Sequence, residues 1–459
     1  MSEMKSNNTA DLFEFFICYS KSDASEHAIK ISAHLNNCGY RSFCDLIYDP
    51  KLLLGDKIYD IICKCNVLIF ICSKNANASA RISDSWINKE IACAHNAGKE
   101  IINIQIGDFQ FEHHNILPRP KLVTRNNAIA DSFLQSLISI IKPPFKLTGS
   151  ILHSFQISHQ EMQAAIANSL SCIDGGSVNE ELCEKILKKI FFNGSLSYQR
   201  VIDCLENDNR AKEHLLILRA LISHLIVVMS RSESLNRFSC ADLRSVWSLL
   251  YQTINEESGL PINCSISTQG FLSLSLYSNI VHGDIRELLR LHIWSRSVSN
   301  YNEHNCFSVH SHQSHAQSWI LSGAIQNSIY FVEKTSRNNT SGQLSFFQPA
   351  WDNSRQYSVK HETSTIQNSS DMALIAQECT ATFHAGKSYE IRSGEFHETA
   401  AVDESKITST LFLFDSGKGW TREAGVIGPA TVKSSSFVRR RPSCIFDQLE
   451  QLNQTILDN

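Results

Sequence analysis

The segment Val67–Cys72 (VLIFIC) is an unbroken apolar run, and it constrains the fold more than any other part of the chain. A strand without polar positions needs both faces of its sheet covered, which is typical of parallel sheets flanked by helices. Strand-like and helix-like segments alternate around it, with strands at Phe13–Tyr19, Tyr40–Cys44 and Glu100–Ile106 and helices at 24–38, 56–65 and 85–97. This order predicts a parallel α/β sheet that binds ligands at the carboxyl ends of its strands.

Four ordered motifs carry a resemblance to a known family. They are FFICYSKSD at Phe15–Asp23, the Cys44-Asp45 loop that reaches Gly55, VLIFICS at Val67–Ser73, and SWINKEIACA at Ser85–Ala94 followed by GKEIINI at Gly98–Ile104. These motifs are similar to the opening strand, the variable loop, a buried strand and the glutamate-bearing helix of NAD-cleaving TIR domains. The resemblance covers residues 11–146 and implies a flavodoxin-like α/β fold with a parallel sheet. A GxGxxG fingerprint of ordinary dinucleotide-binding folds is absent after the first strand.

The resemblance implies that Glu90 is the catalytic residue and that Tyr19, Ser20, Asp45 and Trp86 bind the substrate NAD+. Trp86 and Glu90 are four residues apart, so they share one helix face. Because the nicotinamide of NAD+ is cationic and leaves neutral, one ionised carboxylate suffices to hold the ribose and stabilise the developing positive charge. An ordinary glutamate pKa of about 4.3 keeps that carboxylate charged near neutrality.

Each of these residues also has a purely structural interpretation. Glu90 is then a solvated helix carboxylate paired with Lys89 or Lys99, and Trp86 packs in the core. Tyr19, Ser20 and Asp45 are in that case ordinary turn residues at strand ends. Many TIR domains are adaptors without turnover, so the fold alone does not give an enzyme.

Residues 147–300 are expected to form a helical connector or oligomerisation layer. Helical spacing is seen at Glu180–Phe191, Tyr198–Leu205, Ala211–Met229 and Cys240–Ile254, and the pattern is mainly helical up to Trp294. The apolar stretch His214–Met229 is interrupted by Arg219 and His224, which indicates a buried helix rather than a membrane span. The segment carries no motif with recognisable chemistry.

Residues 301–435 change to short strand-like runs, at Trp319–Ile325, Ser328–Glu333, Leu344–Phe347, Tyr389–Ile391 and Ser409–Phe414. This spacing predicts an all-β sandwich or jelly-roll barrel. Residues i and i+2 of a strand point to the same face, so His310 and His312 are expected on one face. With His397 from a neighbouring strand, they would form a three-nitrogen site for a divalent metal: Fe, Zn, Mn or Ni.

His310-Ser311-His312 with a downstream Gly323, and Gly394-Glu395-Phe396-His397, resemble the two halves of a cupin metal site. The usual glutamate of the first half falls on Ala316, and the usual proline of the second falls on Arg392. The alternatives are compensation by His315 or Gln317, a three-histidine site, and a metal-free ligand sensor. Residues 436–459 are expected to be a tail with a short helix at Phe446–Leu457.

Composition narrows the setting of the molecule. The 42 Lys+Arg residues against 46 Asp+Glu residues give a formal net charge of −4, which argues against a nucleic-acid partner. The 15 cysteines form no CxxC pair and sit largely in apolar runs, as expected for free thiols in a reducing compartment. The first ten residues have no apolar core and do not resemble a secretory signal. We therefore expect a cytoplasmic protein with no membrane partner.

The preferred prediction is a TIR-type NAD+ glycohydrolase that yields nicotinamide and ADP-ribose or a cyclic ADP-ribose, with the C-terminal regions regulating it. The resemblance implies self-association through TIR domains, an activating ligand or protein of unknown identity, and a role in immune or anti-phage signalling. The alternatives are a non-catalytic TIR scaffold and a metal-dependent cupin enzyme.

Overall fold

The computed structural model describes residues 13–457, except 38–39, 48–55, 112–115, 125–128, 142–150, 174–177, 193, 207–211, 232–239, 262, 268, 300–304, 336–343, 353, 355, 440–441 and 443–444. The chain divides into two compact units. Unit 1 comprises residues 1–142 with 377–382, and unit 2 comprises residues 143–376 with 383–459. Of the loop expected at 45–55, only residues 45–47 fall within the described ranges.

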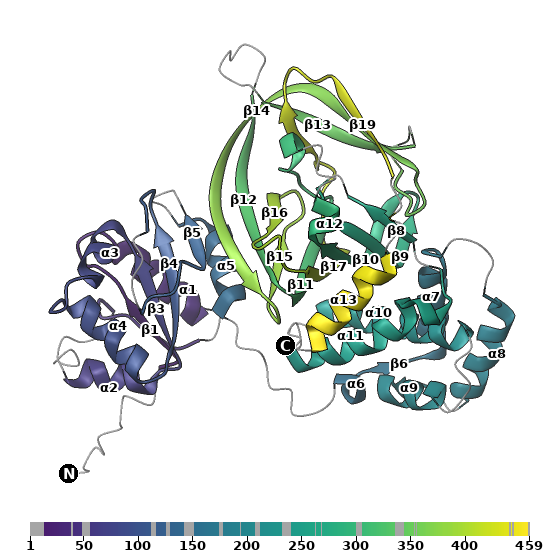
Figure 1. Ribbon diagram of the computed structural model, residues 1–459, viewed down its shortest axis with the longest axis horizontal. Coiled ribbons are helices and arrows are strands. Elements are labelled where there is room, and N and C mark those ends of the chain that lie inside the picture. The colour runs from purple at the N-terminus through teal and green to yellow at the C-terminus, as the bar shows by residue number, and fades with distance from the viewer. Residues whose placement is uncertain are drawn as a thin grey trace, which may run out of the picture. The chain divides into compact units, whose positions relative to one another are not determined.

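Unit 1 contains a parallel sheet with helices on both faces (Figure 1). Its elements are β1 (Phe15–Cys18), α1 (Ser25–Asn37), β2 (Ser42–Phe43), α2 (Asp56–Lys64), β3 (Val67–Cys72), α3 (Lys74–Ala80), α4 (Trp86–Asn96), β4 (Glu100–Ile106), β5 (Leu122–Thr124) and α5 (Asp131–Ile141). The parallel pairs run in the order β2-β1-β3-β4-β5. This is the flavodoxin-like strand order, so the predicted fold class is confirmed.

Burial explains the apolar run that the sequence showed at β3. All of its residues are buried, and alternate members Leu68 and Phe70 pack in one cluster with residues of α2, α3 and α4. Ile69 and Ile71 are equally buried but face the opposite way, because side chains of a strand alternate between its faces. The predicted strands and helices of this unit are found within a few residues. The short elements α3 and β5, and helix α5, were not predicted.

Unit 2 begins with a helical layer. It comprises α6 (Ile151–Ser154), α7 (His159–Leu170), α8 (Glu180–Ile190), α9 (Tyr198–Glu206), α10 (Lys212–Arg231) and α11 (Cys240–Ile254), with β6 (Gln156–Ile157) paired to β7 (Leu196–Ser197). By length and composition, α10 is the one described helix that could cross a membrane, and 78% of its apolar stretch is buried inside the structure.

The rest of unit 2 consists mainly of two sheets of antiparallel strands. One sheet has the order β15-β11-β17-β10-β9-β8, and the other joins β16, β12, β14, β13, β18 and β19. The strands are β8 (Asn263–Ile266), β9 (Leu272–Val281), β10 (Asp284–Trp294), β11 (Ser314–Ser322), β12 (Ala324–Thr335), β13 (Leu344–Trp351), β14 (Thr363–His384), β15 (Ser388–Ile391), β16 (Phe396–Ala401), β17 (Thr408–Trp420), β18 (Val426–Pro429) and β19 (Ser434–Val438). The short helix η3 (Glu256–Ser258) lies between α11 and β8, and the short helices α12 (Arg296–Ser299) and η4 (Asn305–Phe307) lie between β10 and β11. The predicted all-β C-terminal region is therefore confirmed.

The helical pattern expected up to Trp294 is wrong for residues 263–294, which form β8, β9 and β10. In β9 the buried leucines at 272, 274 and 276 alternate with serines, which is the period of a strand. The two-residue link His282-Gly283 has positive φ at both positions, 54° and 84°, as in a type I′ hairpin turn. This turn joins β9 to β10, and both strands belong to the first sheet.

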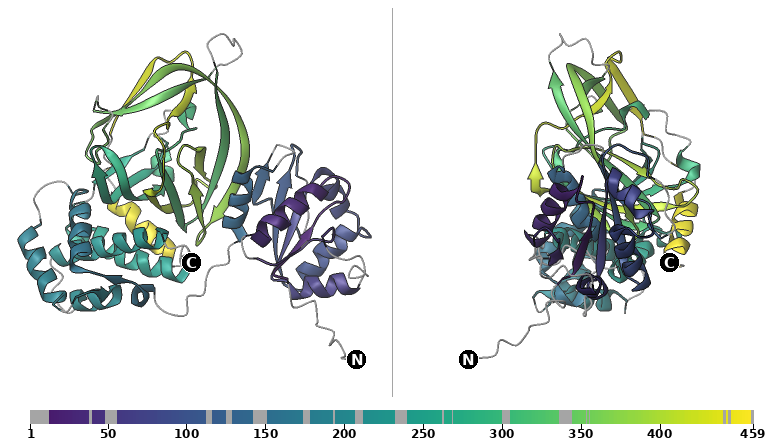
Figure 2. Two further views of the ribbon diagram at one scale, coloured as in Figure 1. Left: turned by 180° about the vertical axis from the view of Figure 1, so that it is seen from behind. Right: turned by 90° about the vertical axis from the view of Figure 1, so that its left-hand side faces the viewer.

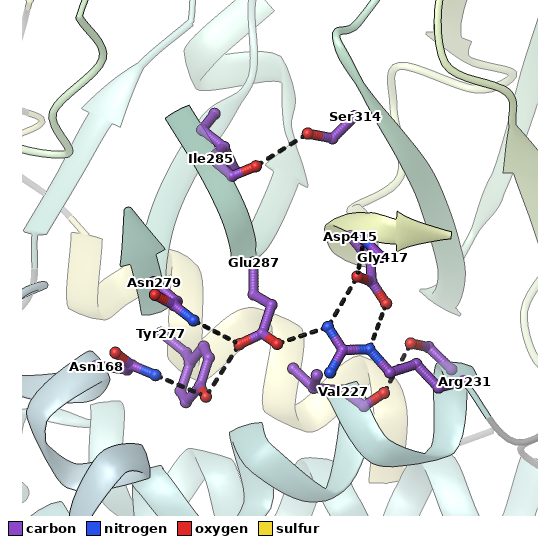
Figure 3. A network of polar contacts seen from close by, with 11 residues as sticks. Asn168, Val227, Arg231, Tyr277, Asn279, Ile285, Glu287, Ser314, Asp415 and Gly417 are labelled. Atoms are coloured by element: carbon purple, nitrogen blue, oxygen red, sulfur yellow. Dashed lines mark hydrogen bonds and ion pairs between the residues drawn. The ribbon is translucent and has the colours of Figure 1, made fainter. Parts of the chain in front are cut away.

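The expected tail is also partly ordered, because β19 ends at Val438 and the chain closes with α13 (Ile445–Leu457). The predicted terminal helix is confirmed. It buries Leu449, Leu452 and Ile456 in the core that the helical layer shares with one face of the first sheet. Figure 2 shows the helices α7 to α11 of unit 2 gathered on one side of the strands of that unit. Where this layer meets the sheet, Arg231 of α10 reaches Glu287 and Asp415 (Figure 3).

Candidate functional sites

The strand order of unit 1 reverses between β1 and β3, and α/β sheets bind ligands at such a reversal. The chain leaves β1 toward β2 on one side and returns to β3 on the other, so the carboxyl ends of β1 and β3 border a topological switch point. Tyr19 and Ser20 follow β1 directly, and Ser73 follows β3. Asp23 accepts a hydrogen bond from Ser73 Oγ at 2.7 Å, which ties the loop after β1 to the start of α3.

Glu90 lies on α4, which is anchored to the sheet by the buried side chains of Ile87 and Ile91. The Ser85 side chain begins this helix by accepting a hydrogen bond from Asn88 N at 3.0 Å. The Glu90 carboxylate is half-buried and hydrogen-bonds the thiol of Cys18, the last residue of β1. The carboxylate is therefore at the carboxyl end of β1.

The ionisation of Glu90 differs from the expectation of an ordinary carboxylate. Burial raises its pKa to about 7, and the negative charge of Asp45 adds to this rise. The Cys18 hydrogen bond and the positive charge of Lys21 oppose the rise without cancelling it. A glutamate with this pKa is partly protonated at neutrality, so the assumption of an unperturbed value was wrong. No ion pair joins Glu90 to Lys89 or Lys99 within the described residues.

Tyr19, Asp45 and Lys21 form a polar group at the ends of β1 and β2. The Tyr19 hydroxyl donates to Asp45 Oδ1, and Lys21 Nζ lies 2.6 Å from Asp45 Oδ2. Burial, together with the Asp45 hydrogen bond, raises the pKa of Tyr19. Ser20 is also buried, with its Oγ 2.8 Å from Ser22 Oγ. The structure thus brings three predicted residues to this edge and adds Lys21, which the FFICYSKSD motif contained but the prediction did not use.

Trp86 does not pack in the core. Its residue is 59% exposed, and its ring stacks on Tyr59 of α2 at 6.4 Å between centroids with 23° between planes. Lys89 Nζ lies 6.0 Å from the same ring. The core-packing interpretation of Trp86 is therefore wrong, and an aromatic surface remains available on the helix that carries Glu90.

The second candidate site lies in unit 2. One nitrogen of each of His310, His312 and His397 falls within 4.8 Å of the others. His397 Nε2 is 3.0 Å from His312 Nε2. The backbones of His310 and His397 exchange two hydrogen bonds, of 3.0 and 2.8 Å, and Gly394 N donates to His312 O at 2.8 Å. These bonds join the two halves of the predicted motif. His397 lies on β16, but His310 and His312 precede β11, so the expectation of both on one strand was wrong.

Neighbouring polar groups orient the histidine rings. His397 Nδ1 lies 2.9 Å from Asn327 Oδ1 in a buried contact, so the ring presents Nε2 to the other histidines. His310 Nδ1 lies 2.8 Å from Ser308 O. Burial lowers the pKa of all three histidines, and mutual repulsion lowers those of His312 and His397 further. Neutral imidazoles held by such partners are the form that binds divalent metals, so the three side chains fit a metal ion.

The substitutes considered for the missing glutamate lie elsewhere. His315 Nε2 is 3.5 Å from Glu390 Oε2, and Lys418 Nζ is 3.0 Å from Oε1 of the same carboxylate. Burial opposes ionisation of Glu390, but His315 and Lys418 lower its pKa to about 2. Neither His315 nor Gln317 is among the described residues that line the cavity around the triad. Compensation by these two residues is therefore not seen.

The histidine triad opens into a cavity of about 930 Å³ between the sheets of unit 2. Every second residue along part of β10 and β17 lines this cavity: Arg290, His292 and Trp294 on β10, and Phe412 and Phe414 on β17. Their strand neighbours Leu289, Leu291, Ile293, Leu411 and Leu413 face the helical layer instead. One sheet therefore separates the cavity from the helices.

A comparison with protein-family models identifies unit 1. Residues 15–129 match the family model described as the TIR domain. This segment is a TIR domain. The match includes Tyr19, Ser20, Asp45, Trp86 and Glu90, and it confirms the TIR domain predicted for the first part of the chain. No curated protein matches the chain.

The solved structures to which the chain is similar include oxalate decarboxylases. One, from a study of Mn(II) centres in the Bacillus subtilis enzyme, is 10% identical, with 35% of this chain and 29% of that chain covered and a TM-score of 0.18. The same enzyme at pH 4.6 is 11% identical, with 34% and 28% covered and a TM-score of 0.17. The chain thus spans less than a third of the length of these proteins.

Proposed function

We propose that the TIR domain hydrolyses the bond between nicotinamide and ribose in NAD+, with Glu90 as the catalytic residue. NAD+ and water give nicotinamide, ADP-ribose and a proton, or a cyclic ADP-ribose when a group of the same molecule replaces water. The supporting observation is the half-buried Glu90 carboxylate beside Cys18, at the carboxyl end of β1 where the strand order reverses.

The chemistry follows from charge. Nicotinamide leaves as a neutral molecule, so no general acid is needed, and the barrier is the positive charge that develops on the ribose. An ionised Glu90 would accept hydrogen bonds from the ribose hydroxyls and stabilise that charge in a site with little water. The cationic nicotinamide of bound NAD+ favours the ionised carboxylate, which offsets the raised pKa of Glu90.

We further propose substrate-binding roles for the four neighbouring residues. The exposed Trp86 ring provides a surface on which a nucleotide ring can stack. Asp45, fixed by Tyr19 and Lys21, keeps the edge of the cleft polar. Ser20 lies directly after β1, where a backbone turn meets the crevice.

The test is nicotinamide release by the purified full chain with NAD+, under crowding conditions that favour assembly. We expect Glu90→Gln to lower kcat about 10²- to 10³-fold, as for loss of one preorganised charge-stabilising group. Glu26→Gln, a matched change at an exposed carboxylate of α1, should leave the rate unchanged. Absence of release from both wild type and Glu90→Gln would favour the TIR scaffold instead.

The biological setting is part of the same proposal. We propose that the protein acts in the cytoplasm as a self-associating assembly, with low activity at rest because continuous loss of NAD+ kills a cell. An activating ligand or protein would raise that activity in immune or anti-phage signalling. Self-association is common among TIR domains, and sedimentation with and without NAD+ would measure it here.

A second proposal concerns the histidine triad. We propose that His310, His312 and His397 bind one divalent metal ion. The proposal is supported by ring nitrogens that lie within 4.8 Å of one another and by the Asn327 contact that orients His397. When bound, such an ion supplies Lewis acidity to a ligand in the cavity. Metal content after incubation with Mn, Fe, Zn or Ni tests the site. His310→Ala and His397→Ala should lose the metal, while exposed His153→Ala should keep it. No bound metal in the wild type would reject the site.

A further inference from the structure

Arg290 of β10 lies in the wall of the unit 2 cavity and has no counter-ion among the residues that the structure describes. Its guanidinium donates to the Tyr357 hydroxyl and lies 5.6 Å from the centre of that ring. Its Nε atom is buried and has no hydrogen-bond partner among the described residues, and no described carboxylate pairs with it. Arg290 is half-buried, so its charge is partly removed from water, and an anion that enters the cavity would supply the missing partner.

His292 repeats the pattern two residues further along β10. The residue is only 6% exposed, and its Nε2 is buried without a partner in the described part of the chain. Residues i and i+2 of a strand share a face, and both side chains line the cavity. Two neighbouring lining residues therefore each carry a buried polar nitrogen without a hydrogen-bond partner among the described residues, which is uncommon in a packed core.

Positively charged side chains outnumber negatively charged ones in the cavity wall. Its described ionisable side chains, histidines aside, are Lys334, Arg290, Arg422, Arg439, Asp284 and Glu423. Lys334 and Glu423 lie 4.0 Å apart and offset each other. Arg439 donates to the Asn263 side chain and to the backbone carbonyl of Val359. Arginines thus dominate the cavity, and they pair with planar carboxylate or phosphate groups through two parallel hydrogen bonds.

Aromatic rings form the rest of the wall near these cations. His292 lies between Phe271 and Phe412, with ring centres 4.5 and 5.0 Å apart. Trp294 continues this row at 4.8 Å from Phe271. Tyr357, which Arg290 contacts, also lies against Trp351, with 5.2 Å between the ring centres. Aromatic walls of this kind can bury a flat ring. A cavity of about 930 Å³ is large enough to hold a ring-bearing small molecule.

We propose that this cavity binds an organic anion that carries a planar ring, with its carboxylate or phosphate on Arg290 and His292 and its ring between the aromatic walls. Nothing in this proposal requires the NAD+ chemistry of the TIR domain or the metal at the histidine triad. The ligand has two chemical sources, since nucleotides and ring-bearing carboxylic acids both combine a flat ring with an anionic group.

Calorimetric titration of the full chain distinguishes these sources with two pairs of probes. AMP is compared with adenosine, and indole-3-acetate with indole-3-acetamide, so each pair differs in the anionic group. We expect at least one anion to bind about 10-fold or more tightly than its neutral partner, because hydrogen bonds to charged groups contribute about 1.5–3 kcal/mol. The titrations are repeated with a chelator and with added Mn²⁺. Equal anion affinity under both conditions would show that the anion does not bind through a metal at the histidine triad.

Variants of β10 test the assignment. Arg290→Gln should remove the preference for the anion, and Arg290→Lys should keep part of it because the charge remains. Arg286→Gln is the matched control, since Arg286 is exposed on the same strand and is not among the lining residues. Circular dichroism confirms that each variant is folded. The proposal is overturned if neither anion binds better than its neutral partner, or if folded Arg290→Gln retains the preference.

Discussion

The guanidinium of Arg231 donates to both carboxylate oxygens of Asp415, from Nε to Oδ2 and from Nη2 to Oδ1 at 2.8 Å each (Figure 3). Arg231 is the last residue of α10, and the Asp415 side chain on β17 is 1% exposed. The same guanidinium lies 2.5 Å from Glu287 of β10. The cation also suits the carboxyl end of a helix, so one residue joins the helical layer to the two strands that line the cavity.

Arg231→Met should destabilise unit 2 because two buried carboxylates lose their partner. Loss of one member of a buried pair costs about 3–5 kcal/mol, and the partial exposure of Arg231 reduces our expectation to about 2–3 kcal/mol. Urea unfolding of the full chain measures this. Arg200→Met, at an exposed position of α9, should change stability by less than about 0.5 kcal/mol. Equal effects of the two variants would show that the ion pairs contribute nothing.

The activity of the TIR domain should depend on pH through Glu90. The reaction needs the ionised carboxylate, and the pKa of Glu90 is about 7 in the free protein. The value of kcat/KM for NAD+ is therefore expected to rise as pH increases through about 7 and to level off above it, because kcat/KM reports the free enzyme. A profile that is flat between pH 6 and 8 would contradict this assignment.

The same pKa predicts a stability change of opposite sign. The folded pKa of Glu90 is raised, so the folded state holds its proton where the unfolded state has lost it, and stability falls as pH rises from about 4.5 toward 7. Glu90→Gln removes the buried charge and should stabilise the protein at pH 8 by about 1–2 kcal/mol. Melting curves of both proteins at pH 5 and pH 8 measure this. A larger gain at pH 5 than at pH 8 would have the wrong sign.

Trp86→Ala should separate binding from stability. If a nucleotide ring stacks on Trp86, its loss raises KM for NAD+ about 3- to 10-fold with little change in kcat, since aromatic pairs contribute about 0.5–1.5 kcal/mol. The ring is 59% exposed, so unfolding should change by less than about 0.5 kcal/mol. Trp86→Phe should recover most of the affinity. An unchanged KM in the alanine variant would remove Trp86 from the substrate site.

Asn327→Ala should weaken metal binding without touching a metal ligand. The amide oxygen accepts from His397 Nδ1 at 2.9 Å, and loss of such a partner lowers metal affinity about 10- to 100-fold. Gln326→Ala is the control, because its exposed side chain lies on the opposite face of β12. Competition with a chelating dye gives the two affinities. Equal metal affinity in both variants would mean that Asn327 does not orient His397.

The sequence predicted those parts of the fold that local patterns encode. The apolar run at Val67–Cys72 indicated a covered parallel sheet, and β3 is buried on both faces. The prediction from sequence failed at residues 263–294. In β10 some leucines are adjacent and others alternate, so the pattern fits the period of a helix as well as that of a strand. The His282-Gly283 pair was the signal that could have corrected this, because a glycine between two apolar runs permits the positive φ of a two-residue hairpin turn. The short strand β5 carries too few residues to show any period.

The candidate sites divide in the same way. The sequence by itself determined the residue types and their local spacing: Glu90 one turn after Trp86, and His310 two residues before His312. Only the tertiary structure decided that burial and Asp45 raise the pKa of Glu90, that Asn327 orients His397, and that no described carboxylate pairs with Arg290. Ionisation and pairing depend on groups far apart in the chain, and those distances are set when the strands pair and the core closes, which no local pattern records.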